Sequence, residues 1–134
     1  MELEYAGFVF SGDKNRLPVE RVCELMTQTY WANSRSRDRI EKAIANSLCY
    51  GIYKNGYLVG FARVVTDGAT FYWLCDVIID QAYRGRGLGK KLVEYITTAG
   101  ELDGLRGALR TRNAHGLYAR YGFVHDSERF MVKE

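Results

Sequence analysis

The sequence has few cysteines, few histidines and no long apolar run. Its three cysteines, Cys23, Cys49 and Cys75, form no CxxC pair, and its two histidines stand ten residues apart. Such a set predicts neither a disulfide framework nor a metal site, and fits reduced thiols in the cytoplasm. No apolar run approaches the ~18 residues of a membrane span. The N-terminus, MELEYAGFVF, is acidic where an export signal would be basic. These absences predict a cytoplasmic protein that does not associate with membranes.

The net charge is also small. Nineteen lysines and arginines against 16 acidic residues leave a formal charge of +3. This charge, without a continuous basic stripe, predicts no nucleic-acid binding. The cations gather instead at two places, in the stretch 83–92 and around Arg35, Arg37 and Arg39. A solvated helix face explains the second group as well as a binding site does.

One proline and no linker in 134 residues predict a single domain, residues 1–134. Apolar periodicity and turn signals such as Asn55-Gly56 divide the chain into strands and helices. The expected strands cover 5–10, 47–54, 57–65, 70–79, 105–111 and a closing hairpin of 123–127 with 129–133; the expected helices cover 19–30, 34–47, 89–100 and 114–121. This order predicts an α/β (α+β) fold in which helices flank both faces of a mixed, mostly antiparallel central sheet.

The stretch 83–92, YRGRGLGKKL, places three glycines among four cationic side chains directly after an apolar strand. A P-loop is excluded because Arg84 and Lys91 stand where that motif needs a glycine and a serine or threonine. The GxGxG spacing also differs from the GxGxxG of dinucleotide-binding folds. A glycine turn that opens a helix leaves backbone N–H groups and the positive end of the helix dipole facing outward. Together with the cations, the turn predicts a diphosphate site.

The hexapeptide 84–89, RGRGLG, matches the Arg/Gln-x-x-Gly-x-Gly/Ala signature of the GCN5-related N-acetyltransferase (GNAT) family. Residues 114–123, AHGLYARYGF, resemble that family's A-x-x-L-Y-x-x-x-G-F segment. The resemblance covers nearly the whole chain and implies the GNAT acyl-CoA N-acyltransferase fold, with acetyl-CoA as co-substrate. Two positions depart from the pattern: Thr111 replaces an asparagine of many members, and Gln81 replaces a proline.

The resemblance also implies how acetyl-CoA is held. In the family, the fourth and fifth strands splay apart, and backbone groups in the gap bind the pantetheine arm. By position, Val77 and Ile79 supply these groups here, and the Val77 N–H lies near the thioester carbonyl as an oxyanion donor. The expected coenzyme-binding residues are Val77, Ile79, Arg84, Gly85, Arg86, Gly87, Leu88, Gly89, Lys90 and Thr111.

Two residues are expected to take part in catalysis. Tyr118 falls where many family members place a tyrosine that protonates the coenzyme sulfur, although such a tyrosine can also be packed for its ring alone. Asp76 is a lone carboxylate in the apolar run WLCDVII, beside the splay point, and is the best candidate for the base. A base is needed because neutralising an alkylammonium at pH 7 costs about 4.6 kcal/mol. A partly buried aspartate satisfied by a neighbouring loop is the alternative for Asp76.

The resemblance implies that the loop between the first two helices lines the acceptor site, and here this loop reads QTYWANSRSRD. Tyr30 and Trp31 could form an aromatic wall for an amine, by cation–π attraction of about 0.5–2 kcal/mol. The alternative is that they cap the core beneath a mobile loop. Arg35 and Arg37 instead favour an acidic acceptor, so the two signals conflict.

The predicted function is transfer of an acetyl group to a primary amine of a small molecule, by direct attack in a ternary complex. Acetylation of a peptide or protein amine and non-catalytic sensing of acyl-CoA are the alternatives. The expected partner is the small-molecule amine, and dimers among relatives make a homodimer a further expectation.

Overall fold

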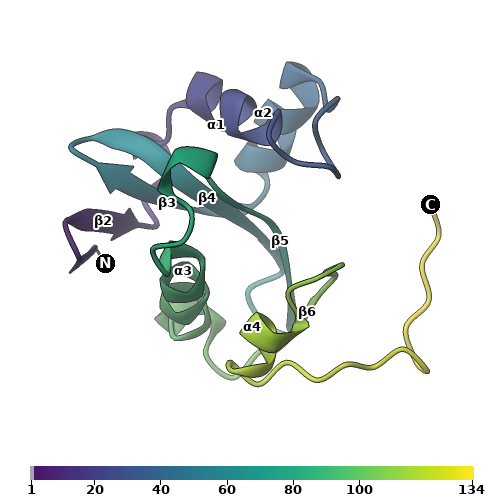
Figure 1. Cartoon of the computed structure of the whole chain (residues 1–134). Helices are drawn as coiled ribbons and strands as arrows, with labels where there is room; N and C mark the ends of the chain where they lie inside the picture. The colour runs from purple at the N-terminus through teal and green to yellow at the C-terminus, as the bar shows by residue number, and fades with distance from the viewer. Residues whose placement is uncertain (1) are drawn as a thin grey trace.

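The computed structural model describes residues 2–134, and a six-stranded sheet runs through the molecule (Figure 1). Its strands lie side by side in chain order: β1 (Leu3–Tyr5), β2 (Phe8–Ser11), β3 (Leu48–Lys54), β4 (Tyr57–Thr66), β5 (Phe71–Ile79) and β6 (Arg106–Leu109). All neighbouring strands are antiparallel except β5 and β6, which are parallel. The predicted mixed, mostly antiparallel sheet is therefore confirmed.

Helices cover both faces of this sheet (Figure 1). On one face lie α1 (Val19–Met26) and α2 (Arg37–Ala45), and on the other lie α3 (Leu88–Thr97) and α4 (His115–Ala119). Three 3₁₀ turns join the elements: η1 (Lys14–Arg16), η2 (Gln81–Tyr83) and η3 (Gly100–Leu102). Each face has its own apolar core, one centred on the α1 residues Val22 and Leu25, the other on the α3 residues Leu92 and Ile96. Within residues 2–134, no helix is long and apolar enough to cross a membrane.

The first predicted strand, over residues 5–10, is instead a short hairpin of β1 and β2. The chain turns at Ala6 and Gly7, whose φ angles are 52° and 83°. Positive φ at two successive residues makes a tight reversal. Glycine at the second position made this turn readable, but the prediction passed over it.

The predicted closing hairpin, 123–127 with 129–133, is wrong for the structure described. No strand occurs after β6 in residues 2–134, and the last segment leaves the body of the molecule (Figure 1). Val124 and Met131 are 86% and 93% exposed. One of its contacts with the body is made by Phe130, which stacks on Trp73 with ring centroids 6.0 Å apart. Alternating apolar residues suggested strands, but within the described residues the segment pairs with no strand of the sheet, and a two-stranded hairpin by itself is marginally stable at best.

Candidate active site

The glycine-rich turn has the geometry that an anion site requires. Gly85 and Gly87 have φ angles of 81° and 76°, in the left-handed region that other residues adopt only at a cost. Gly87 precedes the first residue of α3, and no side chain caps the helix there. The amides of residues 88–90 therefore lack an intrahelical acceptor and lie at the positive end of the helix dipole. This turn can accept a phosphate group on backbone donors.

The four cations beside the turn divide into two pairs. Arg84 donates from Nε to the carbonyl of Ile79 at 3.0 Å, and Lys91 pairs with Glu94 at 2.7 Å. These two contacts hold the turn and the first helical turn in place. Arg86 and Lys90 are exposed, and the Arg86 guanidinium lies 5.2 Å from the centre of the Tyr83 ring. Arg86 and Lys90 are therefore the cations most available to an anion, and Arg84 keeps its two Nη groups for one.

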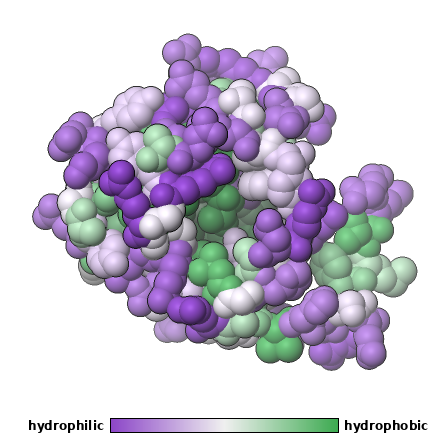
Figure 2. Space-filling model, viewed as in Figure 1, coloured by the Kyte–Doolittle hydropathy of each residue, from purple (hydrophilic) through white to green (hydrophobic). Residues whose placement is uncertain are grey.

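The sheet opens next to this turn. β5 pairs with β6 only from Phe71 to Leu74, opposite Arg106–Leu109. From Cys75 to Ile79, β5 pairs with β4 alone, so its other edge is open. The expected coenzyme-binding residues Val77 and Ile79 lie in this open stretch. Figure 2 shows a hollow in this region of the surface, with an apolar floor and a hydrophilic rim.

A bulge in β5 places Asp76 at the end of the paired stretch. The pairing with β4 shifts register between Phe61 and Arg63, and Asp76 has a φ of 52°. An aspartate tolerates this conformation better than a β-branched residue would. The bulge thus interrupts the strand where β5 and β6 diverge, a common use of bulges beside binding sites.

The Asp76 carboxylate is buried and accepts three hydrogen bonds. Trp31 donates from Nε1 at 2.9 Å, Arg35 from Nη1 at 2.8 Å and Arg63 from Nε at 2.9 Å. Burial alone would raise the pKa of Asp76, but the Trp31 and Arg63 hydrogen bonds and the two guanidinium charges outweigh it. The pKa of Asp76 therefore lies below its usual value. A carboxylate that is held ionised and has three donors is a weak proton acceptor, so the geometry speaks against the predicted base.

Tyr118 is buried on α4, where it lines both cavities that flank this helix. Its ring packs edge-on against Phe123, with centroids 6.1 Å apart. Within residues 2–134, no group forms a hydrogen bond with its hydroxyl. Burial, and then the neighbouring Tyr30, raises the pKa of Tyr118. The phenol is therefore protonated at neutral pH, as a proton donor must be.

Thr111 starts the turn that carries α4. Its hydroxyl accepts a hydrogen bond from the Ala114 N–H at 3.0 Å. The residue that replaces the family's asparagine thus already has a partner inside the protein, which fixes the approach to α4. It lines the same two cavities as Tyr118.

A pocket of about 760 Å³ lies beyond the open edge of β5. Tyr30 and Trp31 form one side of it, with ring centroids 5.0 Å apart. Arg112 lies over the Tyr30 ring at 4.0 Å. Arg37, named with Arg35 as a signal for an acidic acceptor, instead binds Glu41 and Glu20 on the helix surface. We call this pocket, which also contains Asp76, the acceptor pocket.

Sequence reasoning missed three arginines of the acceptor pocket, Arg63, Arg110 and Arg112. Arg63 is a lone charge in the apolar run YLVGFARVV, and a buried charge in a strand requires a partner. That signal pointed to Asp76, the lone carboxylate of the next strand. Arg112 had no such signal, because it follows β6 in a loop where an arginine is ordinary.

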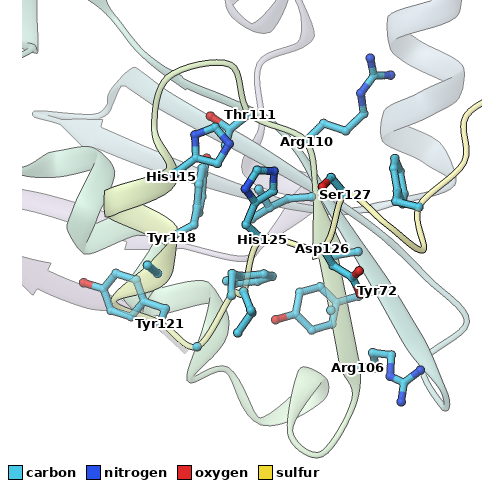
Figure 3. A pocket seen from close by; sticks show the side chains of 18 of the residues that line it. Tyr72, Arg106, Arg110, Thr111, His115, Tyr118, Tyr121, His125, Asp126 and Ser127 are labelled. Atoms are coloured by element: carbon cyan, nitrogen blue, oxygen red, sulfur yellow. The ribbon is translucent and has the colours of Figure 1, made fainter.

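A second cavity, of about 880 Å³, lies between β6 and the C-terminal segment (Figure 3). His115 of α4 and His125 of that segment lie beside each other in it, with ring centroids 5.2 Å apart. Tyr72 of β5 lies across the cavity from them (Figure 3). Residues of the expected closing hairpin, from both 123–127 and 129–133, supply part of its lining.

A helix N-terminus with free amides, beside a parallel strand pair that opens, defines an α+β protein in which a phosphate-bearing ligand could lie along the sheet edge. A model of the acetyltransferase (GNAT) family matches residues 19–123, and the chain belongs to that family. The match includes the glycine-rich turn, the open edge of β5 and Tyr118.

Several relatives extend this assignment. A protein of the GNAT family from Xanthomonas campestris pv. campestris, solved by crystallography, has a TM-score of 0.90 and 36% identity, covering 98% of this chain and 95% of that one. An uncharacterized N-acetyltransferase of Prochlorococcus marinus is 34% identical over 66% of this chain and 51% of its own length. The spermine/spermidine N(1)-acetyltransferase of Bacillus subtilis is 31% identical over 63% of this chain and 68% of its own. The match spans 63% of the length of a relative from Gibberella zeae and 51% of that of the Prochlorococcus marinus protein, so it covers only part of these relatives.

Proposed function

We propose that the protein transfers an acetyl group from acetyl-CoA to a primary amine of a small molecule, by direct attack in a ternary complex. The observation that carries the proposal is the continuity of three features. The free amides of α3, the open edge of β5 and the buried phenol of Tyr118 follow one another along one side of the sheet. The acceptor pocket then adjoins Tyr118.

The residues present fit acetyl-CoA, which would supply an activated acetyl thioester. The diphosphate would be held by the turn Arg84, Gly85, Arg86, Gly87, Leu88, Gly89 and Lys90. The pantetheine arm would lie along Val77 and Ile79, whose strand edge is unpaired on that side. Thr111 would approach the same arm from the β6 side. The Val77 N–H would stabilise the negative charge that develops on the carbonyl oxygen.

Tyr118 would act as the proton donor to the departing thiolate. A phenol with a pKa of ~10 gives its proton to a thiolate of pKa about 8.5 at a cost of roughly 2 kcal/mol. The raised pKa of Tyr118 increases this cost, so its contribution falls near the low end for general acids.

Asp76 would orient the acceptor pocket. It fixes Trp31, Arg35 and Arg63 through its three hydrogen bonds. Although we predicted it as the base from the sequence, its lowered pKa supports a positioning role. Tyr30 and Trp31 would form the wall against which the acceptor lies.

Direct attack is favoured over an acetyl-enzyme because of the state of Cys75. Its thiol lines the acceptor pocket, and burial raises its pKa to about 11. A thiol that stays protonated at neutral pH is a poor nucleophile. The Bacillus subtilis relative named for spermine and spermidine makes a small amine the first acceptor class to test.

Release of free thiol from acetyl-CoA with a panel of small amines tests the proposal. We expect thiol release that depends on the amine, with no acetylated protein detected by mass spectrometry after incubation with acetyl-CoA alone. Acetyl-CoA binding without thiol release for any small amine or peptide would support the sensor alternative. Release with peptides only would support the alternative of a peptide or protein acceptor.

A further inference from the structure

The acceptor pocket is cationic. Four arginines line it, Arg35, Arg63, Arg110 and Arg112, against the two carboxylates of Asp76 and Glu134. Glu134 is exposed and lies 3.5 Å from Arg110 at the rim. The inner part of the pocket therefore contains three guanidinium groups and one carboxylate.

That carboxylate cannot serve an incoming ammonium group. Asp76 already accepts hydrogen bonds from Trp31, Arg35 and Arg63. Its side chain is only 2% exposed, whereas those of Arg35 and Arg63 are 21% and 16% exposed. An approaching ligand would therefore meet guanidinium groups before it met the carboxylate.

The two arginines that bind Asp76 keep donors to spare. A guanidinium has five N–H donors. Among the contacts of residues 2–134, Arg35 uses Nη1 for Asp76, and Arg63 uses Nε for Asp76 and Nη1 for Ser47. Asp76 thus holds both groups in place while leaving N–H donors for a second anion.

Arg112 adds a third cation, which lies over the Tyr30 ring of the aromatic wall. Its guanidinium lies 4.0 Å from the centre of the Tyr30 ring, and none of the ion pairs within residues 2–134 involves it. Stacking on a ring fixes the plane of a guanidinium without satisfying its hydrogen bonds. One face of the Tyr30 ring is therefore occupied by a cation of the protein and is closed to a cationic amine.

From this arrangement we infer that the acceptor is an amine that also carries an anionic group, a carboxylate or a phosphate ester. Arg35 and Arg112 bind the anionic group, with Arg63 behind them, and the amine points toward Tyr118. The inference rests on the proposed acetyl transfer and names the class of its acceptor. Polyamines, which bring only positive charge, are disfavoured.

Matched amines test the inference through thiol release from acetyl-CoA. The carboxylate arm compares 5-aminopentanoate with pentylamine and 1,5-diaminopentane, and the phosphate arm compares 2-aminoethyl phosphate with ethanolamine. Hydrogen bonds to charged groups are worth enough to predict a preference in kcat/KM of about 10- to 100-fold for the anionic member of one arm. The arm with the larger preference identifies the anionic group.

Two variants locate the source of the preference. Arg112→Gln and Arg35→Gln should each reduce the ratio of kcat/KM for the anionic amine to kcat/KM for the neutral amine by about tenfold. The change should come mainly from a higher KM for the anionic amine. Arg37→Gln is the matched control, because Arg37 binds Glu20 and Glu41 outside the pocket, and it should keep the ratio.

Failure of the inference can be told apart from failure of acetyl transfer. Turnover that favours 1,5-diaminopentane, or an anionic preference that Arg112→Gln and Arg35→Gln leave intact, would overturn the inference while acetyl transfer stands. If no amine is turned over, calorimetry with the protein–CoA complex decides. Binding of 5-aminopentanoate or 2-aminoethyl phosphate would support the anionic site, and binding of neither would overturn it.

Discussion

A substitution at Tyr118 tests the proton donor of the proposed reaction. In Tyr118→Phe the ring keeps its edge-on contact with Phe123, so the fold should survive and only the hydroxyl is lost. We expect kcat to fall about 100-fold, near the low end for general acids, with KM for acetyl-CoA little changed. Steady-state thiol release measures both. Tyr121→Phe, on the same turn of chain, is the control, and equal turnover in the two variants would remove Tyr118 as the acid.

Asp76→Asn separates a positioning role from that of a base. Asparagine tolerates the positive φ of 52°, so the bulge should persist. Arg35 and Arg63 lose their counter-charge, and we expect KM for the amine to rise while the acidic limb of the pH–rate profile stays in place. If the acidic limb of the pH–rate profile moved or disappeared in this variant, Asp76 would be the base.

The same variant changes stability in a pH-dependent way. Because the folded pKa of Asp76 is lowered, its ionic contribution is present above the unfolded pKa of about 3.9 and is lost as pH falls through the folded pKa. Loss of one partner of a largely buried pair predicts a destabilisation of about 2–3 kcal/mol at pH 7, below the value for fully buried pairs because both arginines are partly exposed. Urea unfolding at pH 7 and pH 3 measures it. A difference that does not shrink at low pH would contradict the account.

At the scale of elements, short sequence patterns predicted the turns and helices whose conformation depends on a few neighbouring residues. The Asn55-Gly56 turn and the glycine-rich turn appear in the structure where they were read, and the helix expected over 89–100 is α3, which ends at Thr97. Their conformations depend on backbone dihedrals of a few neighbouring residues. For this reason the geometry of the proposed phosphate site at the start of α3 was readable from the sequence.

Long-range contacts could not be read in the same way. The Asp76 cluster joins Trp31 and Arg35, which precede α2, to Arg63 on β4, and it depends on a bulge that shifts the register by one residue. The sequence contains all four polar side chains of the cluster, but it does not show that they lie in contact. The closing hairpin failed for the converse reason, since an alternating pattern does not say whether a partner surface exists.

At the scale of the whole molecule, one sheet brings the two halves of the site together. Its parallel pair opens after Leu74, so the turn before α3 and the acceptor pocket lie at opposite ends of the unpaired edge of β5. A ligand that spans this edge would contact both ends at once. The expected homodimer and the single domain over residues 1–134 are not needed for this arrangement and stay predictions.

The central claim is that the amides at the start of α3 hold the diphosphate of acetyl-CoA. Gly87 and Gly68 allow a matched test, because both have a φ of 76° and open space around the position of a Cβ atom. Valine at either position imposes the same backbone strain, but only Gly87 adjoins α3. Calorimetric titration should show acetyl-CoA binding to the native protein and to Gly68→Val, and at least about tenfold weaker binding to Gly87→Val. Absence of binding to the native protein, or equal affinity in the two variants, would contradict the account.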